Sequence, residues 1–334
     1  MMGGAGDGME IVLNGRGASV PAGESIAGLL RARGVEPARV VVAVNRELVP
    51  RAQWEVVRLQ SGDRVEVVHV VAGGADGDDA LEIAGVRLAS RLICGTGKYP
   101  SAAVMNAALA AADTSLVTVA VRYFDMDLGG RSLLTELDPG KYRLLPNTAG
   151  AYTAEDAIHM AELGRAATGT NWIKLEVIGD RDTLWPDVRA TVTATEELVR
   201  RGFVVLPYTS PDPVVARQLE EAGAATVMPL GSPIGSGQGV LDVASIQRIV
   251  QSVHVPVVVD AGIGSPADAA AAMEAGAAAV LINTAIARAA DPVTMALAMA
   301  LAVRSGRLGL RAGRIARRAE ASPSTATAGV PRIE

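Results

Sequence analysis

The sequence predicts an α/β protein, a (β/α)8 barrel preceded by a small domain of mixed strands and one helix. From Arg91 onward, eight apolar segments of strand length alternate with helical segments over about 220 residues. This number of units and this length are typical of such a barrel. Ahead of them, short strand patterns surround one amphipathic segment and end in Gly73-Gly74. A doubly wound sheet is the rival architecture for the larger part, but it seldom needs eight such even units.

The small domain follows the element order of a β-grasp fold. Its expected elements are two strands in 9–21, a helix in 23–35 and strands in 39–50 and 61–74. Asn14-Gly15 is a hairpin turn signal, and Gly34 ends the helical pattern. A Gly-Gly pair alone is more typical of a flexible hinge. After this order of elements, Gly73-Gly74 favours the tail of a carrier protein.

The larger part begins with a hairpin pattern over 81–91 and continues into the barrel repeat. The expected strands lie in 92–96, 116–121, 142–148, 171–178, 203–209, 225–231, 255–262 and 278–284. Strands that are apolar nearly throughout suit a parallel sheet buried on both faces. The expected boundaries are a disordered extension over 1–8, the small domain over 9–74, a linker over 75–80, the barrel over 81–317 and a flexible tail over 318–334. Periodicity fades after Arg304, where an arginine cluster predicts a solvated surface.

Composition excludes several classes of protein. No continuous apolar run of spanning length and no export signal are found, so we expect no membrane and a cytoplasmic protein. A single cysteine excludes an internal disulfide framework. A net charge of −5 with 3% aromatic residues gives nucleic acid neither a basic surface nor stacking platforms.

The fourth barrel strand, NWIKLEVI, carries two charged residues in an apolar run. Side chains two apart on a strand point the same way, so Lys174 and Glu176 share a face in the lumen or at its mouth. One interpretation is a structural ion pair. The other interpretation is a Schiff-base lysine. Desolvation lowers the pKa of such a lysine and favours the neutral, nucleophilic amine, and Glu176 lies beside it to move protons.

The ends of strands six to eight predict a phosphate site. Loops after strands seven and eight are the usual phosphate cradle of these barrels. Strand seven ends in Asp260-Ala261-Gly262 and strand eight in Asn283-Thr284, which together offer backbone and side-chain donors. The glycine-rich loop 231–239 is interpreted either as plain flexibility or as a mobile rim that closes over a phosphosugar.

Metal chemistry is not expected from this sequence. The three histidines, His69, His159 and His254, are scattered, and a lone cysteine completes no metal constellation. Cys94 is most simply a small core residue. No glycine fingerprint for a nucleotide is evident.

The motifs GTGKYPS, LLPNTAGAYTAEDA, NWIKLEVIGD, VMPLGSPIGSGQG and VVVDAGIGSPADA resemble those of thiazole synthase of thiamine biosynthesis, over roughly Leu81 to Arg317. In the small domain, VPAGESIAGLL, VVVAVNRELVPR and LQSGDRVEVVHVVAGG resemble the ubiquitin-like sulfur carrier of the same pathway. The whole sequence therefore resembles a multifunctional fusion of carrier and synthase.

The resemblance implies a role for each matching residue. Lys174 would form the Schiff base with 1-deoxy-D-xylulose 5-phosphate, and Glu176 and Asp260 would be the acid/base carboxylates. The implied substrate contacts are Gly235, Ala261, Gly262, Asn283 and Thr284. A thiocarboxylate on the Gly73-Gly74 tail would supply sulfur, and dehydroglycine would close the ring to a thiazole phosphate carboxylate.

The resemblance also implies partners. These are an enzyme that makes dehydroglycine from glycine or tyrosine, an enzyme that adenylates the carrier, a sulfur donor and further copies of the chain in a homo-oligomer. It implies no cofactor and no metal in this chain.

Two other functions stay open at this point. One is a Schiff-base aldolase for a phosphosugar, which leaves the Gly-Gly tail unexplained. The other is a non-catalytic carrier on a barrel scaffold. The presence of Lys174, Glu176 and Asp260 together argues against this function. As translated, the Gly74 carbonyl is a peptide amide, and the short linker limits its reach. We therefore expect cleavage after Gly74, with a docking or folding unit as the alternative role of the fused domain.

Overall fold

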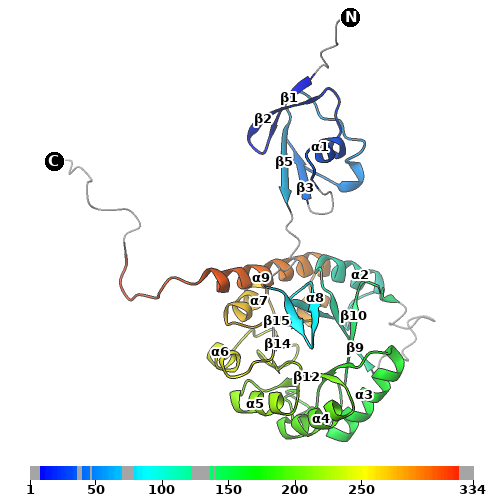
Figure 1. Cartoon of the computed structure of the whole chain (residues 1–334), viewed down its shortest axis with the longest axis vertical. Coiled ribbons are helices and arrows are strands. Elements are labelled where there is room, and N and C mark those ends of the chain that lie inside the picture. Colours follow the sequence, from blue (N-terminus) through cyan, green and yellow to red (C-terminus); the bar gives the residue numbers. More distant parts are fainter. Residues whose placement is uncertain are drawn as a thin grey trace, which may run out of the picture. The chain divides into compact units, whose positions relative to one another are not determined.

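The computed structural model describes residues 8–35, 40–45, 47–69, 79–121, 136–138 and 140–322. The chain forms two compact units, Met1–Gly74 and Ala75–Glu334 (Figure 1). Each unit has its own hydrophobic core, so each is described separately. The Gly73-Gly74 pair and residues 75–78 lie outside the described residues.

The first unit is a five-stranded mixed sheet with one helix. Its elements are β1 Gly8–Leu13, β2 Arg16–Pro21, α1 Ile26–Ala32, β3 Val40–Val44, β4 Glu47–Val49 and β5 Arg64–His69. The strand order is β2-β1-β5-β3-β4, with β1 and β5 parallel and the other pairs antiparallel. Ile26, Leu29 and Leu30 of α1 pack into a core that includes Trp54. This arrangement confirms the β-grasp prediction.

The second unit is a closed barrel of eight parallel strands, as predicted. The strands are β8 Leu92–Gly95, β9 Leu116–Ala120, β10 Arg143–Asn147, β11 Trp172–Leu175, β12 Val204–Thr209, β13 Met228–Pro229, β14 Val258–Asp260 and β15 Ala279–Ile282. Their order is β13-β12-β11-β10-β9-β8-β15-β14. Parallel bridges from Val227 to Val257 and from Leu230 to Asp260 join the two ends of that order and close the barrel.

A small antiparallel hairpin seals one end of the barrel interior. It comprises β6 Leu81–Ile83 and β7 Val86–Leu88. Leu81, Ile83 and Leu88 pack in one cluster with lumen-facing residues of the barrel strands, among them Trp172. Because β8 follows β7 directly, the hairpin lies at the end where the strands begin. The opposite end, where the strands finish, is left for the cavity.

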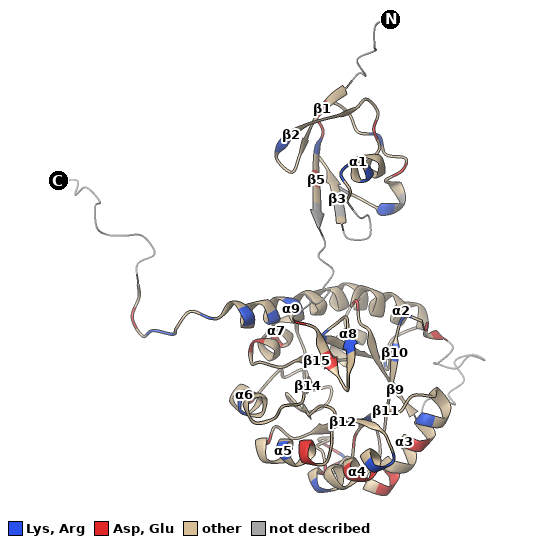
Figure 2. Cartoon of the chain, viewed as in Figure 1, with Lys and Arg blue, Asp and Glu red and all other residues tan. Residues whose placement is uncertain are grey.

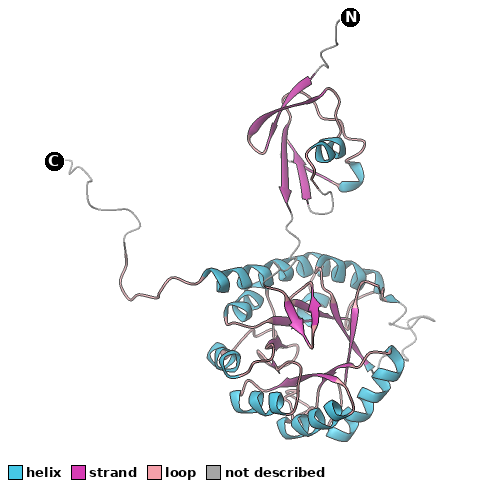
Figure 3. Cartoon of the chain, in the orientation of Figure 1, coloured by secondary structure: helices cyan, strands magenta, loops and turns pink. Residues whose placement is uncertain are grey.

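Helices surround the strands (Figure 3). They are α2 Ala102–Ala111, α3 Ala154–Thr168, α4 Val188–Arg200, α5 Pro213–Glu221, α6 Val243–Ser252, α7 Pro266–Glu274, α8 Thr284–Ala287 and α9 Pro292–Ala312. All but α8 begin at a Ser, Thr or Asp whose side chain accepts a hydrogen bond from the first turn, such as Thr153 from Asp156 N. These caps satisfy backbone donors that a helix leaves unpaired. Figure 2 shows charges of both signs on the outer helices.

The last helix extends further than the sequence predicts. α9 runs to Ala312, past the point near Arg304 where its periodicity fades. By length and composition alone α9 is long and apolar enough to cross a membrane, although its arginines interrupt any continuous apolar run. Its buried residues are Ala296, Met299, Val303 and Gly306. Since this face packs on α2 and α7, core packing accounts for part of the apolar character.

An ion-pair cluster fixes the start of the barrel unit. The Asp79 carboxylate lies 3.0 Å from Arg91 Nη2 and 3.1 Å from Arg307 Nε, and Arg311 Nη1 lies 3.5 Å from it. The hydrogen bond from Arg307, together with the arginine charges, lowers the pKa of Asp79 despite its burial. Part of the arginine cluster assigned to a solvated surface therefore holds the chain beside β8.

We predict that the hairpin seal contributes to barrel stability. Ile83 is fully buried, so Ile83→Ala should lower the free energy of unfolding by about 2 to 5 kcal/mol, through lost burial and an unfilled cavity. Glu82→Ala, on the exposed face of the same strand, is the matched control and should change it by less than about 0.5 kcal/mol. Denaturant unfolding of the full chain measures both. Equal effects of the two variants would contradict a packed seal.

Candidate active site

The strand β11 divides its side chains between the two faces of the barrel wall. Trp172 packs among lumen residues, whereas Ile173 and Leu175 pack in a cluster that includes residues of α3 and α4. The alternation places Lys174 in the lumen above Trp172. Glu176, one residue beyond the strand, lies on the same side, as the sequence predicts.

The Lys174 ammonium group lies between two carboxylates. Its Nζ atom is 3.1 Å from Glu176 Oε1 and 2.6 Å from Asp260 Oδ2. Asp260 is the last residue of β14, which lies across the barrel from β11. The three side chains are 7, 7 and 3% exposed, so their charges interact with little screening by water.

The environment reverses the predicted shift in the pKa of Lys174. Burial alone lowers this pKa, but the charges of Asp260 and Glu176 and their hydrogen bonds more than offset it and raise the pKa above its ordinary value. The resting side chain is therefore an ammonium ion, not the neutral amine that the sequence predicts. The sequence does not reveal that Asp260 comes within 2.6 Å.

Asp260 is the counterpart that can receive the lysine proton. Burial raises the pKa of Asp260, and the nearby Glu176 charge adds to this, while Lys174 opposes it. Among the described residues, Asp260 Oδ2 has no hydrogen-bond partner besides its 2.6 Å contact with Lys174 Nζ. An acceptor oxygen at the cavity thus stays available to a ligand hydroxyl or to a proton.

Two further residues shape this charged group, and sequence reasoning missed both. Thr148 Oγ1 accepts a hydrogen bond from Glu176 N and donates one to Glu176 O, each at 2.8 Å. This fully buried hydroxyl fixes the backbone of Glu176 beyond the end of β11. Tyr208 on β12 is also buried, with its ring centre 5.9 Å from Lys174 Nζ. Thr148 ends one predicted strand and Tyr208 is the second-to-last residue of another, which is the signal that could have found them.

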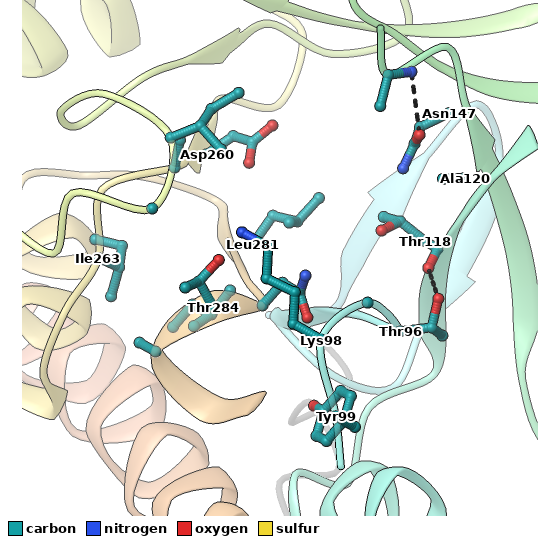
Figure 4. Close-up of a pocket in the computed structure, with 18 of the residues that line it drawn as sticks. Thr96, Lys98, Tyr99, Thr118, Ala120, Asn147, Asp260, Ile263, Leu281 and Thr284 are labelled. Carbon is teal, nitrogen blue, oxygen red and sulfur yellow. Dashed lines mark hydrogen bonds between the residues drawn. The ribbon is translucent and has the colours of Figure 1, made fainter. Parts of the chain in front are cut away.

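The charged group lines a cavity of about 680 Å³ at the carboxyl ends of the strands. The five predicted substrate contacts also line it: Gly235, Ala261, Gly262, Asn283 and Thr284. Figure 4 shows Thr284 and Lys98 close together on one side of the cavity, with Asn147 and Thr118 on another. The structure therefore brings together all the predicted catalytic and substrate-binding residues. It does not describe the Gly73-Gly74 tail.

The glycine-rich loop after β13 is packed rather than loosely extended. A Cβ atom on Gly262 would lie 2.5 Å from Ser232 N, and one on Gly264 would lie 2.4 Å from Gly237 O. Gly239 N also donates to Gly262 O at 2.8 Å. These glycines let two loops meet backbone to backbone, which neither interpretation of the loop anticipated. By contrast, a Cβ atom on Gly235 would meet nothing closer than 3.8 Å.

Other reactive side chains lie elsewhere. Cys94 packs in the layer between strands and helices, where burial raises the pKa of its thiol to about 12. His159 belongs to α3, and the His254 side chain is exposed at the outer surface. Within the described ranges, no three His, Cys, Asp or Glu residues are grouped so that they could hold a metal ion.

Comparison with known proteins identifies the family. Residues 82–326 match the model described as "Thiazole biosynthesis protein ThiG", and residues 10–74 match the "ThiS family". The chain belongs to the thiazole synthase family. It carries a fused sulfur-carrier domain, and the two matches confirm the resemblance on which the fusion was predicted.

Individual relatives agree with this assignment. A thiazole synthase of Paramagnetospirillum magneticum is 44% identical over 96% of this chain and 100% of its own length. A thiazole synthase of a Methylobacterium species is 54% identical over 76% of this chain and 96% of its own length. Among solved structures, a chain of the Amycolatopsis orientalis BexX/CysO complex is 35% identical, with a TM-score of 0.65, over 72% of this chain and 99% of that one.

The site geometry predicts how Lys174 responds to loss of a carboxylate. Asp260→Asn removes one of the charges that raise the pKa of Lys174, so this pKa should fall and the amine should react at lower pH. Reductive methylation of the substrate-free protein at a series of pH values, read by peptide mapping, measures the shift.

Asp242→Asn is the matched control. Asp242 is an exposed cap of α6, and asparagine caps a helix equally well, so the profile of Lys174 should stay that of the unmodified protein. An unchanged profile in Asp260→Asn would contradict the assignment of Asp260 as a charge that keeps Lys174 protonated in the resting protein.

Proposed function

We propose that this thiazole synthase forms its product through an imine between Lys174 and 1-deoxy-D-xylulose 5-phosphate. The observation that carries the proposal is the contact of one buried lysine with two buried carboxylates in a cavity of substrate size. A lysine amine that has passed its proton to Asp260 can attack the ketone, and water leaves as the imine forms. Burial then keeps bulk water away from the imine.

The two carboxylates have separate tasks in this proposal. The imine acidifies the neighbouring carbon, and one carboxylate removes a proton from that carbon. When a proton returns to the carbon that carried the imine, the carbonyl has moved by one position along the sugar. Asp260 Oδ2 and Glu176 Oε1 both lie within about 3 Å of the lysine nitrogen, so each is adjacent to the reacting carbons. The carrier thiocarboxylate then adds its sulfur to the new carbonyl, and dehydroglycine completes the ring.

The substrate phosphate is assigned to the opposite side of the cavity from Asn147. Gly235, Ala261, Gly262, Asn283 and Thr284 are its proposed surroundings. The open space beside Gly235 leaves room for an anion, and Thr284 Oγ1 faces that space as a donor. An aldolase would share these features, but no observation on this chain favours it once the carrier domain is taken into account.

Trapping the imine tests the proposal. Borohydride added with 1-deoxy-D-xylulose 5-phosphate should attach the sugar phosphate to the peptide that contains Lys174. Lys174→Arg retains the buried positive charge but forms no imine, so labelling should be lost while the protein stays folded. Lys141→Arg, at an exposed lysine, is the matched control and should label fully. Labelling that persists in Lys174→Arg, or that maps to Lys98, would refute the assignment.

We further propose that the carrier domain works only after cleavage behind Gly74. Asp79 is held at the amino ends of the strands, because Arg91 precedes β8 and also donates to Ala278 O at 2.6 Å, just before β15. Four residues separate Gly74 from this anchor, and the five Cα–Cα steps between them reach at most about 18 Å.

The reacting groups lie at the other end of the barrel. The six residues of β12 alone measure about 20 Å along the strand. The lumen is sealed by the hairpin, so the tail would have to pass around the outer helices. An attached Gly74 therefore cannot enter the cavity of its own barrel, and its carbonyl, as an amide, offers no carboxylate for adenylation.

Mass spectrometry of protein from the native host tests this second proposal. Two fragments are expected, the smaller ending at Gly74 and partly carrying the mass change of sulfur in place of oxygen. Gly74→Val should abolish the smaller fragment, whereas Asp79→Asn should not. Detection of intact chain alone, in cells that make thiazole without a second carrier, would contradict cleavage.

A further inference from the structure

The distribution of lysine in this chain is unusual. Lysine occurs at three positions, Lys98, Lys141 and Lys174, although the chain has 31 basic residues. Two of the three, Lys98 and Lys174, line the same cavity. Since arginine serves nearly everywhere else, lysine at both cavity positions indicates a chemical need for a compact ammonium group.

Lys98 lies in the turn that follows β8. Its backbone has a φ of +72°, in the left-handed region that residues other than glycine and asparagine rarely adopt. The conformation aims the exposed side chain over the cavity, as Figure 4 shows. A non-glycine residue held in this region is typical of sites where the side chain has a task.

The Lys98 ammonium group reaches the open space beside Gly235. The position of a Cβ atom on Gly235 would be 4.0 Å from Lys98 Nζ and 3.8 Å from Thr284 Oγ1. Three loops, after β8, β13 and β15, therefore converge here with a cation, an open glycine backbone and a hydroxyl donor. This convergence offers an anion more than any one loop does.

The charge of Lys98 is not used within the described part of the chain. Lys174 is matched by Asp260 and Glu176, so the buried group carries a net negative charge when both acids are ionised. Lys98 makes no ion pair or hydrogen bond with the described residues. Among the lining residues that the structure describes, Lys98 is the remaining cation and the one available to a phosphate dianion.

We propose that Lys98 is the positioning residue that binds the substrate phosphate. The inference rests on the proposed function and adds the cation that its phosphate site lacks. The Lys98 side chain has a flexible stem and three hydrogen-bond donors. It can therefore follow the phosphate while the carbonyl moves and sulfur is added, and the sugar stays anchored at its phosphate end. Lys98 thereby selects phosphorylated over unphosphorylated sugars without touching the reacting carbons.

The test compares borohydride trapping at Lys174 with and without the phosphate group. In Lys98→Met, the concentration of 1-deoxy-D-xylulose 5-phosphate for half-maximal trapping should rise about 10- to 100-fold, the value of one charge-assisted hydrogen bond. Trapping of unphosphorylated 1-deoxy-D-xylulose should be the same in Lys98→Met as in the unmodified protein. The saturating extent of trapping at Lys174 should not change.

Lys141→Met is the matched control, because it removes the third lysine, which is exposed and not part of the cavity lining. Methionine at 98 preserves side-chain length and the backbone preference of a non-glycine residue. An unchanged half-maximal concentration for the phosphate ester, or an equal loss for both sugars, would overturn the role of Lys98. Failure of trapping at Lys174 in the unmodified protein would instead overturn the proposed function.

The inference also has a test that needs no imine. Inorganic phosphate binding, measured by calorimetry on the full chain, should weaken in Lys98→Met and stay unchanged in Lys141→Met. Equal binding by all three proteins would contradict the assignment, whatever the outcome of trapping.

Discussion

One ammonium group between two buried carboxylates is the constraint on which the rest of the barrel depends. Lys174, Glu176 and Asp260 come from two strands on different sides of the lumen, so their contact requires a closed barrel. An unpaired charge at such depth would cost far more than a mutual contact returns. In the proposed mechanism the same contact also governs the chemistry, because the Lys174 ammonium group must pass a proton to Asp260 before its nitrogen can attack a ketone.

The surrounding structure can be understood as support for that contact. The Thr148 hydroxyl fixes Glu176 just beyond its strand, and the hairpin seal closes the opposite end of the lumen. Close glycine contacts between the loops after β13 and β14 hold the rim beside Asp260. In our proposal this packed rim holds the reacting end of the site, and the exposed Lys98 side chain is the adaptable anchor for the substrate phosphate.

Much of this could be predicted from the sequence, because it depends on local periodicity. Alternation along β11 was enough to place Lys174 and Glu176 on one face, and the strand count was enough to predict the barrel. The direction of the pKa shift of Lys174 was not predictable, since it depends on a 2.6 Å contact across the lumen. The contact of Thr148 and the proposed role of Lys98 were missed, because Thr148 acts on backbone atoms and Lys98 reaches the cavity from a turn with an unusual φ. The packing of the glycine-rich loop likewise depends on a neighbour about 30 residues away in the sequence.

The central claim is that Lys174 bonds to the ketone carbon of the substrate, and oxygen exchange tests it without any trapping reagent. Imine formation expels the ketone oxygen as water, and hydrolysis restores it from solvent. In water enriched in oxygen-18, with carrier and dehydroglycine omitted, the protein should accelerate label entry into the ketone of 1-deoxy-D-xylulose 5-phosphate. Lys174→Arg should reduce that rate to the uncatalysed value. Exchange at an undiminished rate in Lys174→Arg would contradict the account.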